Sequence, residues 1–73
     1  MLKFLKRLPA EGTHYRLERT DIGYALGRKE DADPTIFNDL AREAIGLAGE
    51  EFVAMPRLDE KADYDQVIII PLD

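Results

Sequence analysis

One stretch of the chain decides the fold, residues 33–49, which reads DPTIFNDLAREAIGLAG. Asp33 is a good N-cap residue, and Pro34 suits the first helical position, where its missing N–H costs nothing. Apolar side chains then recur at the spacing of one helix face, at Phe37, Leu40, Ala41, Ala44, Leu47 and Ala48. Gly49 stands where a helix C-cap is expected. The pattern predicts a helix over residues 34–48.

A β-hairpin is predicted ahead of this helix, because residues 14–19 and 24–29 both alternate in the manner of strands. A four-residue loop between them pairs Leu17 with Leu26 and keeps the larger apolar side chains of both strands on one face. A three-residue loop would scatter these side chains over both faces, so the longer loop is favoured. We expect Gly23 to supply the left-handed residue that ends such a loop.

Residues 2–8 fit two structures. Their apolar and charged side chains alternate broadly as in a strand, while Leu2, Leu5 and Leu8 also fit one side of a short helix. The strand is favoured because it would join the following hairpin as a meander, and the helix stays open as the alternative.

Two further strands are predicted after the helix. Residues 51–58 form the first, and Pro56, which has no N–H to donate to a ladder, places it at a sheet edge or ends it. Residues 59–65 are mostly charged and predict an exposed loop. Residues 67–70, Val-Ile-Ile-Ile, are apolar on both faces, which is typical of a central strand.

These elements predict a single small α+β domain over residues 1–73, in the order β-β-β-α-β-β. The helix packs on one face of a mostly antiparallel sheet of four to five strands. The expected core joins the helix to the strands, through Phe37, Leu40, Ala44 and Leu47 on the helix and Tyr15, Leu17, Leu26, Val67 and Ile69 on the strands.

The last strand carries a second apolar stripe, Ile68, Ile70 and Leu72, on the side opposite Val67 and Ile69. One helix covers only one face of a sheet. We therefore expect this stripe to form either a homodimer contact or an apolar surface for another partner.

Charge is divided unevenly along the chain. Residues 1–29 carry seven basic and three acidic side chains, and residues 30–73 carry three basic and twelve acidic ones, which gives the net charge of −5. Such asymmetry predicts a surface that meets a charged partner. The candidate contact residues for a basic protein surface are acidic and flank the helix or lie on it: Glu30, Asp31, Asp33, Asp39, Glu43, Glu50 and Glu51. The alternative is that they only solubilise the protein.

The basic N-terminal half offers a second hypothesis, direct binding of nucleic acid. In a sheet, the basic side chains Lys3, Arg7, Arg16 and Arg28 would project beside Tyr15 or Tyr24 and could neutralise phosphates while the rings stack on bases. The net charge of −5 opposes this, because it repels a polyanion at long range.

Residue types argue against an enzyme. The chain has no Ser, Cys or Trp and a single histidine, so nucleophilic catalysis would rest on Thr13, Thr20 or Thr35 with His14 as the base. The acidic residues of the 59–65 loop lack the ligand spacing and the glycine of a calcium loop. No Gly-Lys-Thr follows the glycines at 23 and 27. We therefore expect no catalytic residue, no metal and no cofactor.

The chain is expected to be cytoplasmic. No stretch approaches the roughly 20 apolar residues of a membrane span, and the charged N-terminus does not fit a signal peptide. The absence of cysteine fits a reducing compartment.

About half of the chain resembles a known class of proteins. The residues concerned are Gly12-Thr13-His14-Tyr15-Arg16-Leu17-Glu18-Arg19, then Gly27-Arg28, then Asp33-Pro34 opening an alanine-rich helix. They resemble the strand–strand–helix segment of some small phage-encoded anti-CRISPR and other anti-defence inhibitors. The resemblance implies a compact acidic domain that blocks a nucleic-acid-handling host complex without catalysis, and it carries no binding residues over. The expected function is a non-enzymatic, protein-binding inhibitor.

Overall fold

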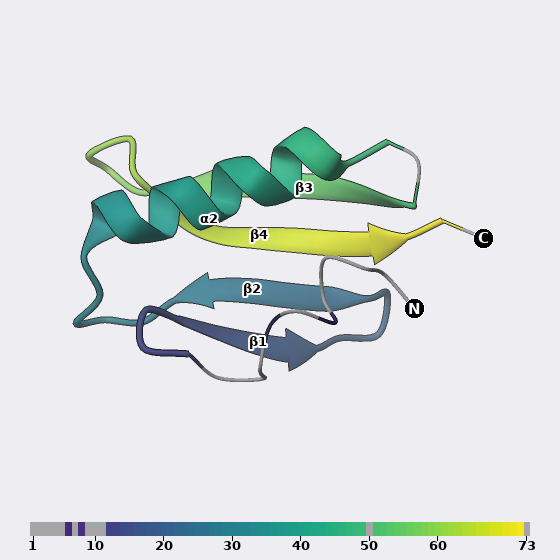
Figure 1. Ribbon diagram of the computed structural model, residues 1–73, viewed down its shortest axis with the longest axis horizontal. Coiled ribbons are helices and arrows are strands. Elements are labelled where there is room, and N and C mark those ends of the chain that lie inside the picture. Colours follow the sequence, from purple (N-terminus) through teal and green to yellow (C-terminus); the bar gives the residue numbers. More distant parts are fainter. Residues whose placement is uncertain (1–5, 7, 9–11, 50, 73) are drawn as a thin grey trace.

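The computed structural model describes residues 6, 8, 12–49 and 51–72 of the chain. Its strands are β1 (Tyr15–Arg19), β2 (Tyr24–Arg28), β3 (Phe52–Leu58) and β4 (Tyr64–Pro71), and the helix α2 spans Pro34–Leu47. The strands form an antiparallel sheet in the spatial order β1-β2-β4-β3, and α2 lies across one face of it (Figure 1). The predicted α+β class and antiparallel sheet are confirmed.

Among the described residues two strands precede α2, whereas the sequence predicted three. The sheet of the described residues accordingly has four strands, and the additional strand over residues 2–8 falls mostly outside the described part of the chain. In that segment Lys6 has helical backbone, and Leu8 packs against the core.

The helix begins as predicted and ends one residue earlier. The Asp33 side chain accepts a hydrogen bond of 2.9 Å from the Thr35 N–H, and Pro34 occupies the first turn. Ala48 leaves the helix with an extended backbone, and its N–H donates to the Ile45 carbonyl oxygen. Gly49 follows with a φ of +117°, a conformation that glycine adopts without strain.

The hairpin has the predicted register, with Leu17 opposite Leu26 and a four-residue loop that ends at Gly23. Gly23 has a positive φ of +158°, a conformation that residues with a side chain rarely adopt, as expected of the residue that ends this loop. A Cβ at Gly23 would overlap the Ile69 carbonyl oxygen and lie 2.7 Å from Pro71 Cδ. Glycine is therefore needed here both for its backbone conformation and because the loop passes close to β4.

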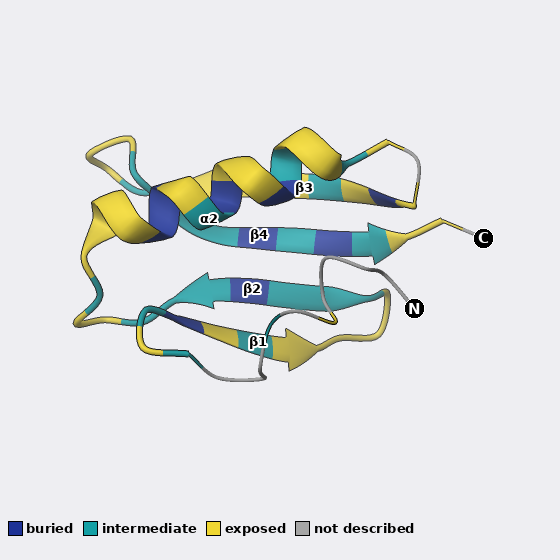
Figure 2. Ribbon diagram, viewed as in Figure 1, coloured by how far each residue is buried: buried dark blue, intermediate teal, exposed yellow. Residues whose placement is uncertain are grey.

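The core lies between α2 and the sheet face beneath it (Figure 2). Its buried members are Phe37, Ala41 and Ala44 on α2 with Tyr15, Leu26, Phe52, Val67 and Ile69 on the strands. Val67 and Ile69 therefore point inward, as predicted. Leu17 and Leu40 are only partly buried, and Leu47 is 48% exposed, which corrects their place in the predicted core. On the helix, positions 37, 41 and 44 face the sheet, and Leu40 and Leu47 lie on one flank.

The order of the strands confirms two further predictions. β3, which contains Pro56, is an edge strand, and β4, which contains residues 67–70, lies between β2 and β3. In the described part of the chain no element covers the face opposite α2. Val53 is 41% and Met55 53% exposed there, beside the half-buried Ile68 and Ile70.

Two glycine-to-alanine substitutions are expected to change stability in opposite directions. Gly23→Ala should lower the free energy of unfolding by at least about 1 kcal/mol, because the new Cβ collides with the backbone of β4. Gly46→Ala places the same methyl group in open space on an exposed helical turn and should raise it by about 0.5–1 kcal/mol. Urea denaturation measures both changes, and equal effects of the two substitutions would contradict the close approach at Gly23.

Candidate functional site

The acidic residues that the sequence singled out do not form one patch. Glu30, Asp31 and Asp33 are exposed in the connection between β2 and α2. Asp39 and Glu43 lie on the outer side of α2, where Asp39 forms an exposed ion pair of 3.5 Å with Arg42. Glu51 is exposed beyond the other end of the helix, and Glu50 lies outside the described residues.

A second acidic segment joins the β2–α2 connection at the same end of the molecule. This segment is the β3–β4 turn, residues 59–63, which lies beside the start of α2 (Figure 1). Glu60 is exposed in this turn. We call the exposed carboxylates of the two connections, Glu30, Asp31, Asp33 and Glu60, the acidic end.

Arg28 ties the β3–β4 turn to the end of β2. Its Nη2 atom forms an ion pair of 2.9 Å with Asp59 Oδ2, and its Nη1 atom donates to the Tyr64 carbonyl oxygen at 3.0 Å. Both ionic side chains are largely shielded from solvent, with 18% and 22% of their areas exposed. Arg28 is therefore engaged within the fold.

Asp59 also organises the turn itself. Its Oδ1 atom accepts hydrogen bonds from the Lys61 N–H at 2.9 Å and the Asp63 N–H at 3.0 Å. The hydrogen bond from Arg28, followed by that from the Asp63 backbone, holds the pKa of Asp59 below its ordinary value of 3.8. The charged form is thus favoured in the folded protein.

Asn38 holds the turn against the helix. This side chain is 8% exposed, and its Nδ2 atom donates to Asp63 Oδ1 at 2.9 Å while its Oδ1 atom accepts from the Tyr64 N–H at 2.8 Å. A buried amide needs such partners, because an unpaired buried polar group costs about 1–3 kcal/mol. The expectation of a solvated loop over 59–65 is therefore wrong in part: four of its residues are half-buried, Asp59, Asp63, Tyr64 and Asp65.

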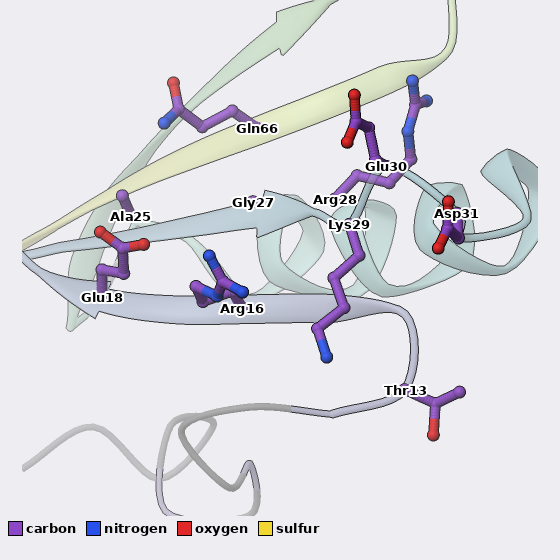
Figure 3. A pocket seen from close by; sticks show the side chains of 10 residues that line it. All are labelled: Thr13, Arg16, Glu18, Ala25, Gly27, Arg28, Lys29, Glu30, Asp31 and Gln66. Carbon is purple, nitrogen blue, oxygen red and sulfur yellow. The ribbon is translucent and has the colours of Figure 1, made fainter.

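The face opposite α2 contains a hollow of about 640 Å³ above β1, β2 and β4 (Figure 3). Gly27 lies at its floor, where an added Cβ would meet only the Arg16 carbonyl oxygen, 3.9 Å away. The charged side chains around the hollow have both signs: Arg16, Glu18, Arg28, Lys29, Glu30 and Asp31.

The residues proposed for nucleic-acid binding do not share one surface. Tyr15 and Tyr24 point to the face under α2, where both contribute to the core, and burial raises the pKa of Tyr15. Arg16 lies on the opposite face, because side chains alternate along a strand. Lys3 and Arg7 lie outside the described residues. The described part of the chain thus has no platform that combines these rings with Arg16.

Comparison with known protein families, curated proteins and solved structures finds no match to this chain. Among the described residues, no group of three or more His, Asp or Glu side chains is arranged to hold a metal ion. In the same part of the chain, no helix is long and apolar enough to cross a membrane. His14 is half-buried, and its Nδ1 atom has no hydrogen-bond partner.

The ionic contact of Asp59 predicts a specific pH dependence of stability. A lowered pKa in the folded state means that the charged Asp59 stabilises the fold above pH 3.8 and that this contribution is lost as the pH falls through the folded-state pKa. Asp59→Asn removes the charge and should destabilise the protein at neutral pH. The difference from the wild type should shrink below pH 3.8, as measured by urea denaturation across the pH range.

The control is Glu60→Gln, the same chemical change at the next residue, whose side chain is exposed. This variant should follow the wild-type curve. An Asp59→Asn penalty that is independent of pH would show that the ion pair with Arg28 contributes nothing.

Proposed function

We propose that this protein is a non-enzymatic inhibitor that docks its acidic end on a basic surface of a larger, nucleic-acid-handling host complex. The observation that supports this most directly is the fixed position of the two connections that carry the acidic end. The ion pair between Asp59 and Arg28 joins the β3–β4 turn to β2, the strand that leads into the β2–α2 connection. Asn38 joins the same turn to α2, the helix that follows this connection.

Rigidity matters because a preorganised surface loses less conformational entropy when it binds. Four exposed carboxylates project from the two connections, and Lys29 and Lys61 are the basic side chains beside them. Complementary charge of this kind accelerates encounter with a basic partner and fixes its orientation. Asp39 and Glu43 extend the acidic surface along the outer side of α2.

The protein would inhibit its partner by occupying the surface on which the partner binds nucleic acid. A surface that binds nucleic acid uses Lys and Arg side chains spaced to neutralise phosphates. Carboxylates held on a rigid frame can take those positions and exclude the nucleic acid without any reaction. The resemblance to phage-encoded inhibitors points to the same class of partner.

The alternative, a small nucleic-acid-binding or regulatory module, has weaker support. It requires the basic N-terminal strands to present aromatic rings beside arginines. Tyr15 is buried on the sheet face that carries α2, and the Arg28 guanidinium is bound to Asp59 and to the Tyr64 carbonyl oxygen.

The proposal is tested with the tagged chain as bait in a lysate of the organism that encodes it, followed by kinetics with the purified partner. Association should slow several-fold as the salt concentration rises, because charge steers the encounter. Glu30→Lys and Asp31→Lys should each slow association several-fold further and flatten its salt dependence. A short DNA duplex should compete with the chain for the partner.

Asp21→Lys is the matched control, because it makes the same change of charge in the β1–β2 loop at the opposite end of the molecule (Figure 1). Equal slowing by Asp21→Lys would show that net charge, not the acidic end, drives association. Gel-shift experiments at low salt are the second part of this test. Tight binding of the chain itself to DNA or RNA would favour the alternative function.

A further inference from the structure

The sheet face opposite α2 has a regular pattern of charge and hydrophobicity. Side chains alternate along a strand, so the residues that share this face with Met55 and Ile68 follow from the register. On β3 and the residue before it they are, in order, Glu51, Val53, Met55 and Arg57, and on β4 and the residue after it they are Gln66, Ile68, Ile70 and Leu72. The Leu72 N–H donates to the Glu51 carbonyl oxygen at 2.8 Å, which extends the ladder to this pair.

This pattern is complementary to itself. Met55 pairs with Ile68 in one row and Val53 with Ile70 in the next, so four apolar side chains surround the centre of the two strands. An acidic residue, Glu51, ends the β3 column on one side, and a basic residue, Arg57, ends it on the other. Rotation by 180° about a line that lies between the two rows and runs across the strands places the Glu51 end of one copy opposite the Arg57 end of the other.

We propose that this face binds a second copy of the chain across a two-fold axis that lies between the two rows and runs across the strands. Val53 then packs on Met55 of the second copy, and Ile68 packs on Ile70 of the second copy. Glu51 meets Arg57 of the second copy, and symmetry makes this contact twice. The two sheets form a sandwich with an α2 helix on each outer side.

The distribution of charge favours a second copy as the occupant. Two chains that each carry a net charge of −5 repel one another, and this repulsion is smallest when they meet where the surface is neutral. The face opposite α2 has such a balance. Arg16, Arg57, Glu18 and Glu51 lie on its strands, and Arg28, Lys29, Glu30 and Asp31 line the hollow in it. The proposed axis also places the two acidic ends at opposite ends of the dimer, where their repulsion is weakest.

The available area predicts a reversible dimer. Four strands about 4.8 Å apart and five to eight residues long give a face of about 400 Å² per copy, or about 800 Å² in the complex. Stable interfaces bury about 1,200–2,000 Å² in total. We therefore expect association that depends on concentration.

Pairing of two sheets edge to edge through β3 is less favourable. Pro56 lies within the edge strand β3 and has no N–H to donate to a neighbouring chain. Such pairing would also leave the apolar side chains of this face exposed to water. The two arrangements differ in their dependence on Met55.

Sedimentation equilibrium from about 1 µM to about 1 mM tests the proposal. The wild-type chain should show a monomer–dimer equilibrium. Met55→Lys places a charge at the centre of the contact and should weaken association at least 100-fold, and its circular dichroism should be unchanged because Met55 is exposed. A wild-type chain that is monomeric over the whole range, or a dimer that survives Met55→Lys, would overturn the proposal.

Charge reversal tests the direction of the axis. Glu51→Arg and Arg57→Glu should each raise the dissociation constant about tenfold, because each creates two like-charge contacts. The double variant Glu51→Arg/Arg57→Glu restores opposite charges and should return the constant to within about threefold of the wild type. Asp39→Arg, on the outer side of α2, should have no such effect. A double variant whose loss of binding free energy equals the sum of the two single losses would overturn this geometry.

Discussion

A helix buries only one face of the sheet on which it lies, and this limit governs the rest of the molecule. α2 brings Phe37, Ala41 and Ala44 against the strands, and the largest fully buried side chains all belong to the layer between them. Small residues at positions 41 and 44 let the helix approach the sheet closely. The opposite face is left with Val53 and Met55 in water. The proposed association of this face with a second copy of the chain is based on this shortage of cover.

The same helix also determines the shape of the acidic end, through its one buried polar residue. Asn38 lies on the side of α2 that faces the β3–β4 turn, and both polar atoms of its side chain are used there. Since the turn is also bound to Arg28, helix, strand and turn form one polar cluster at the start of α2. The fold thus separates an acidic, hydrogen-bonded end from a neutral, partly apolar face.

Local pattern was sufficient to predict the elements and several details of their pairing. The N-cap at Asp33, the Leu17–Leu26 register and the edge position of β3 each depend on residues close in sequence or on a backbone group that proline lacks. The exposure of Leu47 was missed, because apolar spacing does not tell which flank of a helix meets the sheet.

The polar cluster could not be predicted in the same way. Asn38 and Asp63 are 25 residues apart in sequence, and Arg28 and Asp59 are 31 apart, so no spacing rule connects them. The acidic composition of the 59–65 segment favoured a solvated loop, whereas two of its carboxylates accept hydrogen bonds inside the fold. An asparagine near the inward side of an amphipathic helix was the one local signal, since a buried amide requires partners.

The position of β4 has a consequence for the order in which the chain can fold. This strand comes last in the sequence and lies in the interior of the sheet, between β2 and β3. During synthesis, β1 and β2 can pair as a local hairpin, but β3 has no neighbour until residues 64–71 emerge. Insertion of β4 then joins the two halves and completes the surface on which α2 rests. Sheet completion is therefore a late, long-range event, which slows folding relative to a fold built from local contacts.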